Sequence, residues 1–296
     1  MLQLLLGGSG SGKTTLLYQR IRARAEKGEK SILLVPEQFT SSTEGRIYRE
    51  LGDALSGMVE SFSFTSLAEK ILSTEGGAAV QTLSDAGRAV LVCRALEELQ
   101  DNVHYYHRHR RSAAFCQMAA QTIDELKSAG LSGRQLAQLA GACGAESGKL
   151  SELALIFQGY ETLLARSGMD PSDRLELAGA RLEEALARHS LPEFLRDRAV
   201  FIDEFDTFNA PKKRLLGAML AALPSVTVAL CDDGAPLLPG DLSLFSGAKQ
   251  VAAQLRQLAR KNGAEVAVPQ LLRKDLRHRN APGPVSYTHL TLPTIR

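Results

Sequence analysis

A glycine-rich stretch near the start of the chain constrains its fold more than any other feature. Residues 7–14 read GGSGSGKT, which matches the pattern G-x-x-x-x-G-K-[ST]. The apolar run LQLLL precedes this stretch at residues 2–6, and a helix-favouring segment follows it at residues 15–25. Such a run is typical of a strand buried on both faces of a parallel sheet. The succession of strand, loop and helix therefore predicts an α/β fold.

The residue types in this loop suit the binding of a nucleotide phosphate. Glycines let backbone N–H groups approach phosphate oxygens closely, and the N-terminus of the following helix adds a favourable dipole. In this pattern the Lys13 ammonium reaches the β- and γ-phosphates, and the Thr14 hydroxyl binds Mg²⁺. We therefore predict a site for ATP and Mg²⁺, the alternative being a glycine-rich turn that binds nothing. The predicted nucleotide-binding residues are Gly7, Gly8, Ser9, Gly10, Ser11, Gly12, Lys13, Thr14 and Thr15.

Composition narrows the class of protein. The chain has 296 residues, 44% of them hydrophobic, so it is long enough for two compact units. Its net charge of +2 neither requires nor excludes nucleic acid, and any DNA contact needs a local basic patch. No apolar run approaches 18 residues, and the N-terminus lacks the basic segment of a signal peptide. We expect a cytoplasmic protein that has no contact with a membrane.

The four cysteines are widely spaced, at Cys93, Cys116, Cys143 and Cys231. They form no C-x-x-C pair, so their spacing argues against a zinc or iron–sulfur site within this chain. We expect reduced, mostly buried thiols, as in other cytoplasmic proteins.

The pattern of hydrophobic residues divides the chain into an α/β domain and a helical insertion. Residues 1–75 and 196–270 alternate apolar runs with helical segments, whereas residues 76–195 show helical periods almost throughout. We predict one discontinuous α/β domain with a parallel sheet, interrupted by a mostly helical insertion. The expected strands lie near residues 2–6, 31–35, 58–62, 198–202 and 225–230, with a weaker one at 264–269.

Two carboxylates follow one of the predicted strands. The apolar run at residues 199–202 ends directly in Asp203 and Glu204. At this place in a phosphate-loop domain, Asp203 would bind Mg²⁺ and Glu204 would orient the attacking water as the catalytic residue. The alternative is that both carboxylates cap the strand end and form surface ion pairs.

The stretch IDEFDTF at residues 202–208 resembles motif II of superfamily 1 helicases. Longer stretches, in their order and spacing, resemble the AddB-type B subunit of the bacterial AddAB/RexAB helicase–nuclease over residues 1–280. These stretches are GGSGSGKTTLL, LLVPEQFT, SFSFTSLA, LSDAGRAVL, YYHRHRRSAAFCQMAAQTIDELKSAGLSGRQL and DPSDRL.

This resemblance implies a P-loop NTPase fold like lobe 1A of a superfamily 1 helicase, with a 1B-like insertion. It implies an ATP-binding, DNA-binding subunit that processes double-strand breaks for homologous recombination. The partners would be an AddA-type motor and nuclease subunit and DNA, as single strands or duplex ends. The family's nuclease and iron–sulfur cluster belong to a C-terminal region absent from this chain. The second motor lobe, with its arginine finger, is also absent, so we expect nucleotide binding with little turnover.

Two regions are candidates for DNA contact. One comprises residues 39–40 and 64–65, which follow the ends of two predicted strands. The other is the basic–aromatic stretch HYYHRHRR at residues 104–111. Rings can stack on bases while arginines contact phosphates. The alternatives are core aromatic rings, which we favour for Phe62, and a solvated helix edge. The candidates are Phe39, Thr40, Phe64, Thr65, Tyr105, Arg108, Arg110 and Arg111.

Two other functions stay open from the sequence. An autonomous P-loop ATPase or small-molecule kinase would use the insertion as a large helical lid. A helical scaffold would bind only a partner protein. Residues 284–296, PVSYTHLTLPTIR, do not continue the preceding pattern and resemble a translated sequencing adapter. We expect a non-native tail there, the alternative being a linker rich in proline and threonine.

Overall fold

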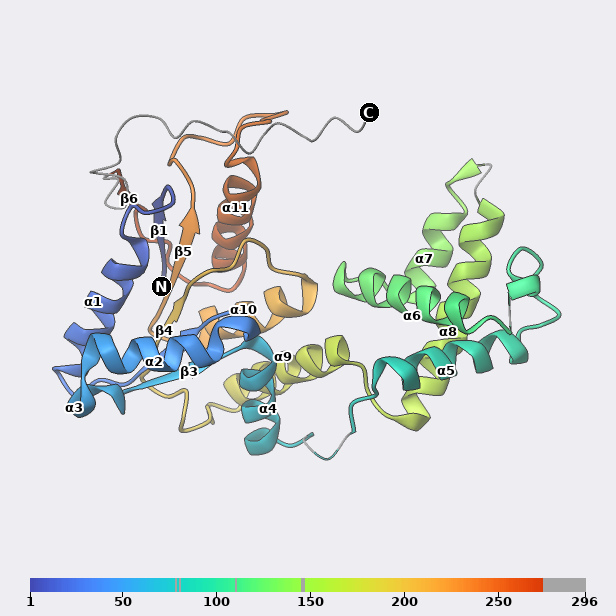
Figure 1. Cartoon of the computed structure of the whole chain (residues 1–296), viewed down its shortest axis with the longest axis horizontal. Helices are drawn as coiled ribbons and strands as arrows, with labels where there is room; N and C mark the ends of the chain where they lie inside the picture. Colours follow the sequence, from blue (N-terminus) through green and yellow to red (C-terminus); the bar gives the residue numbers. More distant parts are fainter. Residues whose placement is uncertain (78, 80, 110, 145–146, 274–296) are drawn as a thin grey trace, which may run out of the picture.

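The computed structural model describes residues 1–77, 79, 81–109, 111–144 and 147–273. An α/β unit built on one sheet and a bundle of helices lie side by side (Figure 1). Because the sheet is parallel and covered by helices, the predicted α/β class is confirmed. No helix in these described ranges is long and apolar enough to cross a membrane. The tail at residues 284–296 lies outside the described residues.

The sheet has six strands in the order β3-β2-β4-β5-β1-β6, and every neighbouring pair is parallel. Strand β5 lies between β1, which leads into the glycine-rich loop, and β4, which leads into Asp203. All strands end at one edge of the sheet, the carboxyl edge. The strands are β1 (Leu2–Gly7), β2 (Ser31–Leu34), β3 (Val59–Phe62), β4 (Ala199–Ile202), β5 (Ser225–Cys231) and β6 (Gln270–Leu272).

Five strands form where they were predicted, but the prediction of a strand at residues 264–269 was wrong in its position. That segment makes a single bridge, between Val266 and Leu2. Strand β6 begins just past Pro269, which has no N–H to donate to a ladder.

Helices cover both faces of the sheet. The side chains of a strand alternate between faces, so Leu4 packs with α4, α9, α10 and α11, while Leu5 packs with α1 and α2. This explains why the predicted strands are continuously apolar. The helices of this unit are α1 (Lys13–Ala25), α2 (Thr40–Leu51), α3 (Asp53–Ser56), α4 (Phe64–Glu75), α9 (Pro171–Ala187), α10 (Ala210–Ala222) and α11 (Ser246–Lys261), with the 3₁₀ turn η1 (Glu37–Phe39).

The helical bundle has its own core, built on residues such as Phe157 and Tyr160. Local signals set its helix starts: serine side chains cap α5, α6 and α7. Lys127 on α6 joins the bundle to the start of α9, since its ammonium lies 2.8 Å from Asp170 and 2.7 Å from Asp173. The elements are α5 (Asp85–Glu98), η2 (His107–His109), α6 (Ala113–Ser128), α7 (Gly133–Ala140) and α8 (Ser147–Ser167).

The expectation of reduced, mostly buried thiols was wrong. Cys93 on α5 and Cys116 on α6 form a disulfide, with their Cα atoms 5.6 Å apart. The packing of α5 against α6 brings the two residues within bonding range, which their sequence spacing does not reveal. Cys143 and Cys231 are free and exposed.

Candidate nucleotide site at the carboxyl edge of the sheet

The glycine-rich loop between β1 and α1 is a backbone structure that requires its glycines. Gly10 and Gly12 have φ angles of 75° and 90°, in the left-handed region that strains other residues. A Cβ added at Gly7 would lie 2.4 Å from the Ser11 hydroxyl. Gly12 is also the N-cap of α1 and provides no side-chain cap, so the N–H groups of the first turn remain available to a ligand.

Lys13 is the first residue of α1, and its side chain returns over the loop. Its Nζ donates hydrogen bonds to the carbonyl oxygens of Gly7, at 2.7 Å, and Gly8, at 2.8 Å. A positive charge is thereby held against the same backbone whose N–H groups line the loop. This arrangement suits an anion, because a phosphate would meet both the ammonium and the helix N-terminus.

The sheet brings Asp203 next to the loop. Asp203 follows β4, and its side chain is buried, 6% exposed. Burial raises the pKa of this carboxyl, while a hydrogen bond from the Thr14 hydroxyl opposes the rise. The backbone N–H of Glu204 also donates to Asp203 Oδ1, at 3.0 Å. The two predicted metal-binding residues, Thr14 and Asp203, are therefore neighbours although most of the chain separates them.

Glu204 stands at the mouth of the same site. Its backbone has a φ of 65°, an uncommon conformation for a residue with a side chain and one that recurs at functional sites. Burial raises the pKa of its carboxyl, and the neighbouring charge of Asp203 raises it further. An exposed carboxylate beside a buried one can accept a proton from a water molecule in the cavity.

Two adjoining cavities lie at this edge. Residues 10–15, together with Arg46 and Glu204, line a cavity of about 380 Å³. A smaller one of about 200 Å³ lies against Thr14, Tyr18 and Asp203, and Arg46 lines it as well. Arg46 was not among the residues predicted from the sequence. No motif marks it in the sequence: the helical period of α2 places Arg46 only at the border of the buried face.

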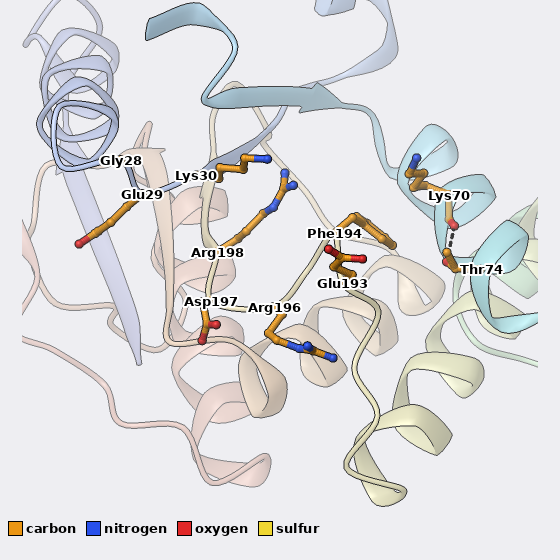
Figure 2. A pocket seen from close by; sticks show the side chains of 10 residues that line it. All are labelled: Gly28, Glu29, Lys30, Lys70, Thr74, Glu193, Phe194, Arg196, Asp197 and Arg198. Carbon is orange, nitrogen blue, oxygen red and sulfur yellow. Dashed lines mark hydrogen bonds between the residues drawn. The ribbon is translucent and has the colours of Figure 1, made fainter.

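A further cavity, of about 600 Å³, lies at the opposite edge of the sheet, where β2 and β4 begin (Figure 2). Basic and acidic side chains are mixed in its wall, and some of them form ion pairs. Arg198 is paired with Glu60, and Glu29 is paired with Arg24 at 2.9 Å. None of the predicted site residues lines it.

Of the candidates for DNA contact at the strand ends, Phe64 is the most deeply buried. This side chain is 3% exposed, with its ring 5.2 Å from that of Phe205 and 6.0 Å from that of Phe208. It packs in the core and contributes to the wall of a cavity that Thr65 also lines. Phe39 is partly buried against the core of α1 and α2. Thr40 begins α2, and exposed Thr65 lines a cavity of about 390 Å³.

The basic–aromatic stretch lies in the helical bundle, at the far end from the glycine-rich loop (Figure 1). Tyr105 is 58% exposed, and Arg108 and Arg111 are also exposed. Arg110 lies outside the described residues. The buried carboxylate of Glu152, on α8, accepts hydrogen bonds from the backbone N–H groups of residues 104, 105 and 106. The predicted nucleotide site and the predicted stretch for DNA contact are thus separate.

A family model and similar curated proteins indicate the same family for this chain. The family model described as "ADDB, N-terminal" matches residues 4–283. The chain is 34% identical to the ATP-dependent helicase/deoxyribonuclease B subunit of Desulforudis audaxviator, over 90% of this chain and 23% of that protein. It is 32% identical to the protein of that name from Moorella thermoacetica, over 90% of this chain and 24% of the relative. It is 29% identical to the one from Clostridium perfringens, over 94% of this chain and 24% of the relative. The chain spans less than a quarter of the length of these curated relatives.

Proposed function

The chain belongs to the AddB N-terminal family, and on that premise we propose that it is the ATP-binding, DNA-binding part of a helicase/deoxyribonuclease B subunit. The observation that carries the proposal is the meeting of Thr14 and Asp203 beside the loop that bears Lys13. A phosphate loop, a hydroxyl and a buried carboxylate at one sheet edge are the parts that a P-loop NTPase lobe needs.

The residues present fit a magnesium nucleotide. A hydroxyl and a carboxylate are the oxygen ligands that Mg²⁺ prefers, and the raised pKa of buried Asp203 reflects a negative charge that a cation would stabilise. The bound ion would neutralise phosphate charge. Lys13 and the loop N–H groups would bind the β- and γ-phosphates. Glu204, in the cavity wall, would orient a water molecule and accept its proton.

We further propose that the helical bundle contacts DNA through its basic–aromatic stretch. Glu152 accepts hydrogen bonds from three successive backbone N–H groups, at residues 104–106, and exposed Tyr105 and Arg108 lie within or close after this held segment, with exposed Arg111 beyond. Such a surface suits single strands or duplex ends, where rings stack on bases and guanidinium groups bind phosphates. The proposed role is the processing of double-strand breaks for recombination, together with an AddA-type motor and nuclease subunit.

Equilibrium binding of Mg-ATP tests this proposal. A buried, charge-assisted contact contributes about 1.5–3 kcal/mol, so Lys13→Ala should weaken ATP binding about 10- to 100-fold. Lys27→Ala, which removes the same charge from an exposed position past the end of α1, is the matched control and should bind normally. Unchanged binding by Lys13→Ala would contradict the proposal. Rapid single-turnover hydrolysis by the unmodified chain alone would instead favour an autonomous ATPase or kinase.

A further inference from the structure

Helix α2 contributes one arginine to the wall of the phosphate-loop cavity. Arg46 lines this cavity together with residues 10–15 and Glu204. It also lines the adjoining smaller cavity, where Thr14 and Asp203 meet. The guanidinium therefore lies on the side of the loop that holds the proposed metal-binding pair. In a bound nucleotide this is the side of the terminal phosphate.

A ring contact holds Arg46 in this place. Its Cζ lies 4.9 Å from the centroid of the Tyr18 ring, on the second turn of α1. Tyr18 is almost fully buried, and burial raises its pKa to about 12, so the ring is neutral at physiological pH. A cation over such a ring is attracted to it and loses little of its hydrogen-bonding capacity, because the guanidinium N–H groups point outward in the plane of the group.

The charges around the cavity leave this guanidinium available. The positive charge of Arg46 opposes the rise that burial causes in the pKa of Asp203 and of Glu204, and all three residues line the smaller cavity. Within the ranges that the structure describes, however, no carboxylate forms an ion pair or hydrogen bond with it. Arg49, one turn further along α2, also lines the smaller cavity, but it donates to the carbonyl oxygen of Gly45 and does not line the cavity of residues 10–15. Arg46 is thus a partly buried cation that faces a cavity and has donors to spare.

We propose that Arg46 binds the terminal phosphate of a nucleoside triphosphate and makes this site prefer a triphosphate over a diphosphate. The proposal rests on the nucleotide site proposed above. Lys13 and the loop N–H groups serve the β-phosphate in either nucleotide, whereas a group on α2 beside Thr14 and Glu204 meets only the γ-phosphate. Guanidinium is suited to this task because its planar fork can donate two parallel hydrogen bonds to one phosphate.

Calorimetric affinities for Mg-ATP and Mg-ADP test this assignment in the full chain. Arg46→Gln should weaken Mg-ATP binding about tenfold or more and change Mg-ADP binding less than about twofold. Arg46→Lys keeps the positive charge and loses the planar fork of donors, so its affinity for Mg-ATP should lie between those of the unmodified chain and Arg46→Gln. Lys27→Gln, at an exposed position past the end of α1, should leave both affinities unchanged and controls for the loss of one positive charge.

The outcomes separate this assignment from the nucleotide site itself. An equal weakening of both nucleotides in Arg46→Gln would show a structural role and overturn the inference, while the nucleotide site would stand. Unchanged Mg-ATP affinity in Arg46→Gln would overturn it as well. If the unmodified chain binds neither nucleotide, the proposed function fails and the assignment of Arg46 fails with it.

Discussion

Glu152 holds the basic–aromatic stretch, and its replacement should destabilise the packing of that stretch on the helical bundle. The side chain is 6% exposed and lies on α8. Its carboxylate accepts hydrogen bonds from the backbone N–H groups of His104 at 2.7 Å, Tyr105 at 2.9 Å and Tyr106 at 3.3 Å. The replacement Glu152→Ala deletes the single acceptor that these three donors share.

The size of the effect follows from these hydrogen bonds. A hydrogen bond to a charged group contributes about 1.5–3 kcal/mol. The bond at 3.3 Å is long, and the part-buried backbone N–H groups of His104 and Tyr105 can recover part of their loss by binding water once the carboxylate is gone. Two bonds at the lower value give a loss of about 3 kcal/mol in the free energy of unfolding of the bundle. Glu152→Gln keeps one acceptor oxygen without the charge and should lose about half of that.

Urea unfolding measures the loss in the free energy of unfolding, and amide hydrogen exchange measures the release of the stretch. The amides of residues 104–106 should exchange much faster in Glu152→Ala. The control Glu97→Ala removes an exposed carboxylate from neighbouring helix α5 and should change stability by less than about 0.5 kcal/mol. If Glu152→Ala behaves like this control, with exchange at residues 104–106 unchanged, the carboxylate does not hold the stretch and the reasoning fails.

Two further predictions concern the two proposed sites. Because burial raises the pKa of Asp203, its ionised form destabilises the fold at neutral pH, and this cost disappears as pH falls below the unfolded value of about 3.9. Asp203→Asn should therefore unfold at a higher temperature than the unmodified chain at pH 7, and this difference in unfolding temperature should shrink towards pH 4. The variant should also lose Mg-dependent ATP binding. A difference in unfolding temperature that stays constant across pH would refute burial of the Asp203 charge as its cause. In the bundle, Arg108→Ala with Arg111→Ala should weaken binding of single-stranded DNA irrespective of sequence and lower the salt slope by about 0.7 for each phosphate that the arginines no longer neutralise. An unchanged slope would mean that the two arginines are only solvated surface.

The sequence was sufficient for the parts of the fold that depend on local pattern. Apolar runs such as residues 31–35 predict the parallel strands because both faces of each strand are covered. The spacing of the loop and the acidic pair after β4 was enough to nominate Lys13, Thr14 and Asp203, since the carboxyl ends of parallel strands share one edge.

The remaining features depend on contacts between segments far apart in the chain. Phe64 is core because Phe205 and Phe208 cover it, and nothing in its own neighbourhood indicates that. Arg46 belongs to no motif and gains its position from the packing of α2 beside α1. Lys127 likewise meets Asp170 only through the fold, where two helices of different units join. A single sequence carries no direct record of such distances.

The central claim is that the nucleotide binds at the carboxyl edge of the sheet, and hydrogen–deuterium exchange with saturating Mg-ATP tests it most directly. We predict slower exchange for the amides of residues 8–15, which form the loop, and 203–204, which lie beside it. We predict no change at residues 28–30 and 193–198, segments that contribute most of the wall of the cavity at the other edge. Lys13→Ala should lose this protection at the same ATP concentration. Protection at residues 28–30 and 193–198, with residues 8–15 unaffected, would contradict the claim.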